Sequence, residues 1–308
     1  MAIQHELSWS ASRSGTFAEC KRRYYYEYYL SWSGWDRRAP KERQQAYLLK
    51  KMTRMPMLAG DLVHQAIERW IKERAQGRIL APEDLQRFCA ESLREGYRTS
   101  RSGAWKTRPS KLIHLAEHHY EEECIQEADG RAGDYGKRYL ERMENAVRNF
   151  LYSAALGPAR EAEPAGFLAC EELSTFERFG TKVYAVPDFA YRDAQGTVHV
   201  WDWKTGRPSE RDVFQLEVYV EFAEASWGAD PDQVVCYDAY LGEDHVSSLR
   251  TDDESRSRTL ERMRVSMAEM AALHFDADRS TGNPADFPQI DPGATCGRCN
   301  FRELCDRA

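Results

Sequence analysis

Two acidic residues and one lysine stand close together in the second half of the chain. Asp188 follows Pro187, and after thirteen further residues Asp202 and Lys204 flank a tryptophan. Residues two apart on a β-strand point to the same face of a sheet, and neighbouring strands lie about 4.8 Å apart. If both segments are strands, the two carboxylates converge with the lysine beside them.

Such a group suits phosphodiester hydrolysis. Carboxylate oxygens hold Mg²⁺ or Mn²⁺ while leaving positions for water. A bound ion polarises a phosphate and lowers the pKa of a bound water. Lys204 would then position that water, help to deprotonate it, or stabilise the developing charge. The alternative is a set of exposed charges on a β-strand.

The surrounding sequence predicts the elements that must position this group. Val198 and Val200 alternate with His199, which favours a strand. Strands are expected at residues 166–179, 182–192, 197–204, 233–241 and 245–250. Helices are expected at residues 16–30, 58–75, 82–97, 110–128, 134–156, 209–227 and 252–275, and residues 33–54 are expected to be loop with some helix. This order predicts an α/β protein with a mixed sheet, and it is unlike a Rossmann unit.

The chain divides into three predicted parts. The character of the sequence changes after Gly157-Pro158, from helical to strand-rich. We therefore expect an N-terminal helical part over residues 1–77, an inserted helical subdomain over residues 78–160, and a core with the cysteine tail over residues 161–308. No internal repeat, Gly-rich dinucleotide loop or P-loop is found in the sequence.

Composition and charge narrow the class of protein. Of the 308 residues, 42% are hydrophobic and 30% charged, as in ordinary globular proteins. No run of 18 apolar residues occurs, and residues 1–10 lack a signal-peptide pattern, so we expect a cytoplasmic protein with no membrane partner. The first 110 residues carry 21 Lys/Arg against 12 Asp/Glu, and the rest carry 22 against 38. A basic first third permits a phosphate-binding surface or is only a solvated helical surface.

The acidic and basic residues also carry a family resemblance. Pro187-Asp188 followed by Asp202-x-Lys204 resembles the signature of the PD-(D/E)XK nucleases. Gly60-x-x-x-His64 and Gln215-x-x-x-Tyr219 resemble two further elements of RecB-type nuclease domains. The resemblance implies a restriction-endonuclease-like αβββαβ core. It also implies a metal site made by His64, Asp188 and Asp202, and catalytic roles for Asp188, Asp202, Lys204, Gln215 and Tyr219.

Each of the added elements also has a simpler interpretation. Gln215 and Tyr219 are four apart, so they share one helix face and can donate hydrogen bonds to a DNA phosphate or support Lys204. His64 alone is more often a packed helix residue, and Tyr219 alone is usually core. Glu171 or Glu172, on the preceding strand, either faces the site or is a solvated carboxylate.

Three of the eight cysteines lie in the last 13 residues, as Cys296, Cys299 and Cys305. Cys20 is the candidate for a fourth ligand. Thiolates select Zn²⁺ or iron–sulfur clusters, and the chemistry leaves both open. Resemblance to RecB-type nucleases with an iron–sulfur cluster implies a 4Fe–4S cluster on these four cysteines. It would staple the termini by closing a loop of about 275 residues.

A basic and aromatic run follows Cys20. Lys21, Arg22 and Arg23 precede Tyr24, and these four residues are expected to contact DNA through phosphates and base stacking. The alternative is that several of the neighbouring tyrosines belong to the core. We expect a positively charged groove leading to His64 and Asp188.

These features together predict a metal-dependent DNA nuclease. The resemblance, shared with CRISPR adaptation nucleases and iron–sulfur single-strand exonucleases, favours an exonuclease on single-stranded ends. It would work in recombination, repair, CRISPR adaptation or phage defence. Because the chain has no helicase motor, it would act alone or with a helicase, CRISPR integrase or other complex subunit in trans. The alternatives are a non-cleaving DNA-end-binding or assembly subunit and, more weakly, an electron carrier.

Overall fold

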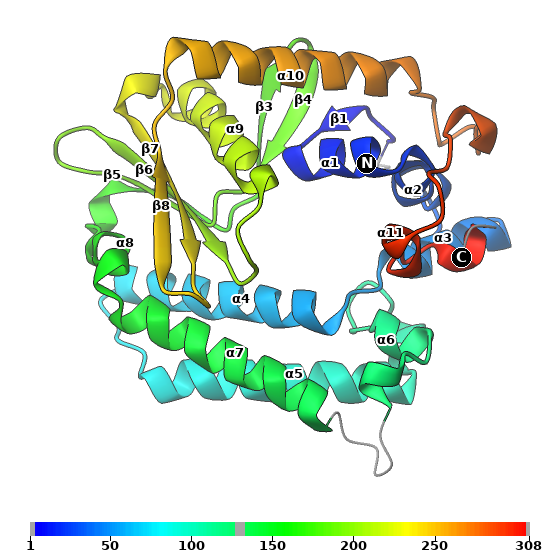
Figure 1. The fold of residues 1–308 in the computed structure, drawn as a ribbon, viewed down its shortest axis with the longest axis horizontal. Helices are drawn as coiled ribbons and strands as arrows, with labels where there is room; N and C mark the ends of the chain where they lie inside the picture. The colour runs from blue at the N-terminus through cyan, green and yellow to red at the C-terminus, as the bar shows by residue number, and fades with distance from the viewer. Residues whose placement is uncertain (1–3, 127–132, 306–308) are drawn as a thin grey trace.

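A mixed five-stranded sheet, in the order β2–β5–β6–β7–β8, forms the centre of the molecule (Figure 1). The structure is a computed structural model that describes residues 4–126 and 133–305. The strands are β2 (Phe167–Cys170), β5 (Phe189–Arg192), β6 (Val198–Lys204), β7 (Val234–Tyr240) and β8 (His245–Leu249). β6 and β7 run parallel, joined by the crossover helix α9 (Glu210–Trp227), while the other neighbours are antiparallel. The predicted mixed α/β class is confirmed.

A second sheet has the order β1–β4–β3. Its strands are β1 (Ser8–Trp9), β3 (Ser174–Arg178) and β4 (Thr181–Ala185). The predicted single strands over residues 166–179 and 182–192 are wrong, because each is broken between the two sheets. Glu171 adopts a φ of +55° after β2, and its N–H donates to the Asp188 carbonyl at 3.1 Å. One long hairpin thus bends, and both acidic residues lie at the bend.

The N-terminal segment is several short helices rather than one. The helix predicted over residues 16–30 is α1 (Ala11–Glu19), α2 (Lys21–Tyr25) and a π-helical turn (Tyr26–Leu30). Cys20 is extended between α1 and α2, with a φ of −159°, and its sulfur caps α2. A further helix, α3 (Lys41–Lys50), lies in the segment predicted as loop with some helix.

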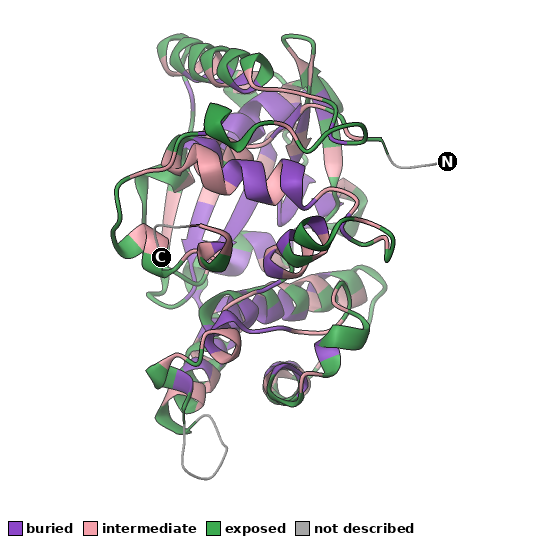
Figure 2. Ribbon diagram, turned by 90° about the vertical axis from the view of Figure 1, so that its right-hand side faces the viewer, coloured by how far each residue is buried: buried purple, intermediate pink, exposed green. Residues whose placement is uncertain are grey.

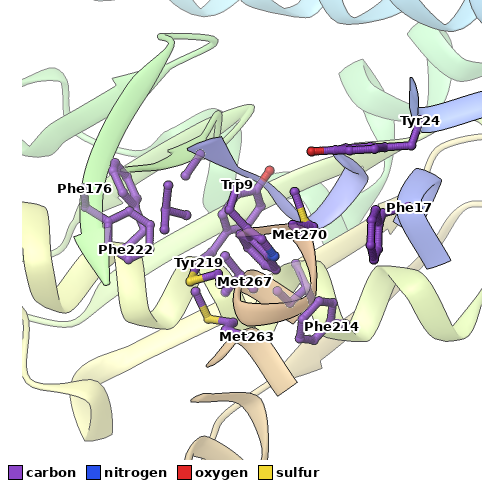
Figure 3. Packing of buried hydrophobic residues seen from close by; sticks show 14 of the residues in the cluster. Trp9, Phe17, Tyr24, Phe176, Phe214, Tyr219, Phe222, Met263, Met267 and Met270 are labelled. Carbon is purple, nitrogen blue, oxygen red and sulfur yellow. The ribbon is translucent and has the colours of Figure 1, made fainter. Parts of the chain in front are cut away.

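The first hydrophobic core lies between the sheets, α9 and α10 (Asp253–Ala272). Trp9, fully buried, reaches from β1 into this core beside Phe214, Met267 and Met270 (Figure 3). Its indole N–H donates to the Ser266 hydroxyl at 3.1 Å. The N-terminal strand is therefore fastened to the last long helix, next to the helix that carries Gln215 and Tyr219.

The second core lies on the opposite face of the five-stranded sheet. It joins α4 (Met55–Ala75), α5 (Pro82–Ser102) and α7 (Gly133–Tyr152) to Trp201 and Trp203 of β6. Buried residues follow the sheet and the inner helix faces (Figure 2). The segment predicted as an inserted subdomain thus shares its core with α4 and the sheet. No helix in residues 4–126 or 133–305 has the length and apolarity that crossing a bilayer requires.

The helix predicted over residues 110–128 is wrong. Only α6 (Ala116–His119) and a 3₁₀ turn (Glu123–Ile125) are helical among its described residues up to 126. Thr53 pairs instead with the backbone of this segment: its N–H donates to the His114 carbonyl at 2.9 Å, and its carbonyl accepts from Ala116 at 2.8 Å. These hydrogen bonds to Thr53 take the place of helical hydrogen bonds in the segment around Leu115.

Candidate functional site

An imidazole and two carboxylates meet at the bend of the hairpin. His64 lies near the middle of α4, and its Nδ1 is 3.1 Å from Glu171 Oε1 and 3.4 Å from Asp188 Oδ1. One ligand atom from each of the three residues lies within 4.8 Å of the others. Asp188 is 6% exposed, and its second oxygen accepts the backbone N–H of Trp203. The bend therefore aims three donor groups from distant segments at one point.

Burial controls the protonation of these groups. Burial and the neighbouring Asp202 carboxylate raise the pKa of Asp188 to about 7. Burial disfavours the charged form of His64, but Asp188 and Glu171 outweigh it and hold the pKa of His64 well above its usual value. A proton or a cation is thus needed to balance the carboxylates at this point.

A second network surrounds Asp202 and Lys204 on the face of β6 that α9 covers. Lys204 forms an ion pair with Asp202, and its Nζ donates to Gln215 Oε1 at 3.0 Å. The amide of Gln215 donates to Asp202 Oδ1 at 3.0 Å and to the Tyr219 hydroxyl at 2.8 Å. The Tyr219 hydroxyl is 2.8 Å from the carbonyl of Val186, in the same bend as Asp188. The network connects both strands of the predicted motif through α9.

Further acidic groups enclose the lysine. Lys204 Nζ is 3.6 Å from Asp212 Oδ1 and 3.8 Å from Asp238 Oδ1. Burial works against the ammonium, but Asp202, Asp238 and Asp212 outweigh it and raise the pKa of Lys204. Lys204 is therefore an ammonium that donates hydrogen bonds at neutral pH. Burial raises the pKa of Asp238 to about 7, although the lysine opposes the shift.

The donor set fits a hard divalent cation. One imidazole nitrogen with carboxylate oxygens is a ligand set that Mg²⁺ and especially Mn²⁺ accept. The closest group of donors is His64, Glu171 and Asp188, whereas the predicted ligand set had Asp202 in place of Glu171. Asp202 is 3% exposed and is held by Lys204, Gln215 and Tyr219. It lies close enough to Asp188 to raise that residue's pKa.

The four predicted cysteines come together at the edge of the molecule. Cys20, Cys296, Cys299 and Cys305 are half-buried and line one small cavity. Backbone N–H groups lie 3.5 Å from the sulfur of Cys20 and 3.4 Å from that of Cys299, and the Gln289 amide lies 3.2 Å from that of Cys305. Such donors stabilise thiolates. The chain ends thus meet at a group of sulfur ligands.

The sulfurs are not gathered as tightly as the ligands of one bound zinc ion. Thiolates about 2.3 Å from one tetrahedral Zn²⁺ would lie about 3.8 Å from one another. Among the described residues, which include all four cysteines, no three of these sulfurs lie within 4.8 Å of one another. Four cysteine sulfurs on one small cavity are a ligand set for zinc or for an iron–sulfur cluster.

The predicted DNA-contacting residues divide into buried and surface groups. Tyr24 is 2% exposed and packs against Phe17, with ring centroids 5.0 Å apart, so its predicted stacking on a base is wrong. Arg22 donates to the Phe287 carbonyl at 2.9 Å, and Arg23 pairs with Glu19 at 3.1 Å. The Lys21 ammonium lies 4.9 Å above the Phe17 ring. Contacts of these three cations with DNA stay a prediction.

Sequence reasoning missed two acidic residues of the site, Asp238 and Asp212. The sequence offers Glu171 and Glu172 equally, because only the bend shows which side chain turns inward. Asp238 lies in parallel register with Asp202, and Asp212 lies on the first turn of α9. A buried acidic residue in an otherwise apolar strand was the available signal for Asp238.

Comparison with known proteins agrees with this geometry at the level of family. No curated protein matches the sequence. A solved structure titled "Crystal structure of SSO0001" is 12% identical and aligns over 69% of this chain and 84% of its own, with a TM-score of 0.29, too low to support an argument about fold. The model of the PD-(D/E)XK nuclease superfamily matches residues 8–306. This chain therefore belongs to the PD-(D/E)XK nuclease superfamily, whose members are metal-dependent nucleases.

Proposed function

We propose that the protein is a deoxyribonuclease that degrades single-stranded DNA from an end. The observation that carries the proposal is the convergence of His64, Glu171 and Asp188 with the Asp202–Lys204 pair at one corner of the sheet. A scaffold that only binds DNA has no need for an ammonium enclosed by acids beside a ready cation site. Family membership supports the nuclease activity, and the substrate and its polarity belong to the proposal.

His64, Asp188 and Asp202 would hold Mg²⁺ or Mn²⁺, and Glu171 would complete or orient the site. The bound ion would polarise the phosphate and lower the pKa of a bound water. His64 Nδ1 already faces both carboxylates of the bend. Binding of the ion therefore requires His64 to give up its proton and Asp188 to be ionised.

Lys204 would hold the attacking water and the phosphate rather than remove a proton. Its pKa is raised, so the ammonium persists at neutral pH and stabilises the charge that develops on the phosphate oxygens. Gln215 is hydrogen-bonded to both Lys204 and Asp202, and its amide also donates to the Tyr219 hydroxyl, which holds the Gln215 side chain in place. The two α9 residues thus position the catalytic pair.

The cysteine site would hold a 4Fe–4S cluster with a structural role. It would join α2 to the C-terminal tail and so keep Lys21, Arg22 and Arg23 beside the nuclease core. Thiolate ligands of this kind persist in a reducing compartment, so we place the protein in the cytoplasm. A helicase or CRISPR integrase in trans would supply the single-stranded end, in repair, recombination, CRISPR adaptation or phage defence.

Digestion of end-labelled DNA tests the proposal. The purified protein, prepared without oxygen, is incubated with single-stranded and duplex oligonucleotides labelled at either end, with Mn²⁺, Mg²⁺ or EDTA. We expect metal-dependent shortening of single strands from one end. Binding without cleavage in every metal would instead establish the non-cleaving DNA-end-binding alternative.

A further inference from the structure

A second groove adjoins the proposed active site on the side of the helical layer. It has a volume of about 770 Å³ and lies between α4, α7 and the loops that follow β6 and β7. Gly60 and Thr205 line it, and they are also neighbours of the site: Gly60 is one helical turn before His64, and Thr205 directly follows Lys204. The groove therefore lies beside the proposed centre of cleavage.

Three exposed arginines line this groove. Arg138 and Arg142 stand one turn apart on α7, and Arg207 lies on the loop after β6. Glu141 and Glu243 also line it, but Glu141 lies 3.8 Å from Lys137. The guanidinium of Arg142 is 5.4 Å from the centre of the mostly buried Tyr139 ring. The groove thus offers positive charge with no exposed aromatic platform.

The position of α7 relative to the sheet is fixed by two amides. Asn149 donates to the Leu241 carbonyl at 2.7 Å, and Asn145 donates to the Gly242 carbonyl at 3.1 Å. Both acceptors follow β7, the strand parallel to β6. The arginines of α7 are therefore held at a set place relative to the end of β6, where Lys204 lies.

The larger groove on the other side of α9 has a different character. Its volume is about 1200 Å³, and it lies between α1, α9 and α10. Arginine and glutamate balance along it: Arg23, Arg211, Arg258 and Arg262 against Glu19, Glu254, Glu261 and Glu269. Several of these pair with one another, as Arg258 does with Glu254 at 2.6 Å. The net charge favours the smaller groove for a polyanion.

We propose that the α4–α7 groove binds the phosphate backbone of the single strand being cleaved, through Arg138, Arg142 and Arg207. This inference rests on the proposed function and adds the path of the substrate beyond the cleaved bond. A groove lined by Gly60, one helical turn from His64, and by Thr205, directly after Lys204, is placed to receive the strand being cleaved. Because no aromatic ring is exposed there, the contacts are to phosphates and independent of sequence.

Charge reversal on α7 tests the path. Arg138→Glu/Arg142→Glu is compared with Arg94→Glu/Arg98→Glu, which makes the same change of charge on α5 in a separate groove. Fluorescent oligothymidine of about 30 nucleotides, longer than the about 4–16 nucleotides that a single-strand module covers, is titrated by anisotropy in EDTA. The titrations are repeated between about 50 and 200 mM salt.

We expect the α7 variant to bind at least about tenfold more weakly and to lose about 1.4 from the slope of log affinity against log salt, since each single-strand phosphate contact contributes about 0.7. The α5 variant should stay near wild type. If the two variants bind with the same affinity and salt slope, the proposed path of the strand through the α4–α7 groove is wrong. It is also wrong if polyglutamate, a polyanion without phosphates, displaces the oligonucleotide equally from both variants.

Cleavage of a short oligonucleotide with Mn²⁺ is measured on the same proteins. The α5 variant should cleave it at the parent rate, whereas the α7 variant should cleave it more slowly at subsaturating concentrations because it binds the strand more weakly. If wild type binds through α7 but cleaves nothing, the groove assignment stands and the nuclease proposal fails. If wild type cleaves and the α7 variant binds normally, the nuclease proposal stands and the groove assignment fails.

Discussion

The two proposed metal centres are built in opposite ways. At the carboxylate and lysine centre, side chains hold one another: Asp202 accepts from Gln215 and pairs with Lys204, and both are fixed to α9. At the cysteine centre, four half-buried sulfurs stand at the edge, with isolated N–H donors beside them. The hydrogen bonds between its own side chains fix the geometry of the first centre. The geometry of the second centre depends on the metal that its four sulfurs would bind. Loss of the ion should therefore cost activity, and loss of the cluster should cost stability.

The largest expected effect is on catalysis. Lys204→Ala removes the ammonium that faces Asp202, and we expect the rate of single-strand cleavage to fall by about 10²–10³-fold, the usual effect of deleting one stabilising donor. The melting temperature should change little by comparison. The measurement is single-turnover cleavage with saturating Mn²⁺, with circular dichroism melting on the same samples.

Lys182→Ala is the matched control. Lys182 lies on β4, and its ammonium pairs with Glu6 at the surface. It should cleave at the parent rate. A Lys204→Ala protein that cleaves as fast as Lys182→Ala would remove Lys204 from the mechanism.

The second effect is on the cysteine centre. Cys299→Ser should abolish the visible absorbance of anaerobically purified protein. It should also make the C-terminal tail that carries the cysteines susceptible to proteolysis. The expected loss of stability is about 2–5 kcal/mol, the range for cross-links that close long loops. Cys124→Ser, an exposed cysteine outside the group, is the control. If the wild-type protein contains zinc and has no visible absorbance, the cysteines bind a single zinc ion and the cluster assignment is wrong.

The third effect concerns pH in the absence of metal. Asp188 and Asp238 have pKa values raised to about 7, and that of His64 is raised also. Raised pKa values contribute stability at low pH that is lost as pH rises through the folded values. The melting temperature in EDTA should therefore fall between about pH 5 and pH 8, by about 1–2 °C per kcal/mol lost.

Mn²⁺ should act in the opposite direction. It binds ionised Asp188 and neutral His64, so its stabilisation should be greater at high pH than at low pH. Thermal melts at matched ionic strength, with and without Mn²⁺, measure both trends. A Mn²⁺ shift that is the same at both ends of this range would contradict the assigned ligands.

The smallest effect tests how closely α4 must approach β6. A Cβ on Gly60 would lie 2.8 Å from Thr205 Oγ1. Gly60→Ala should slow cleavage by about fivefold or less, equivalent to about 1 kcal/mol, because Thr205 must move beside Lys204. Adding Thr205→Ala removes the contact and should restore the rate. If Thr205→Ala does not restore it, the close approach is not the cause.

Local patterns were enough for much of the site. Two-residue spacing placed Asp202 and Lys204 on one face of β6, and four-residue spacing placed Gln215 and Tyr219 together on α9. His64 and the four cysteines were recognised by resemblance, and the structure brings each set together. The prediction that Tyr24 stacks on a base was wrong, because the sequence of a Tyr-rich helix does not show which tyrosines pack into the core.

The sequence by itself determined the strand that carries Asp202 and Lys204, the helix that follows it with Gln215 and Tyr219, and the cysteines at both ends, because these depend on short spacings. Only the tertiary structure decided that Glu171 turns inward, that Asp238 joins Lys204 and that Leu115 pairs with Thr53 instead of lying in a helix. Each of these depends on a backbone bend or on pairing with a strand or segment far away in the chain, and no local periodicity records such a partner.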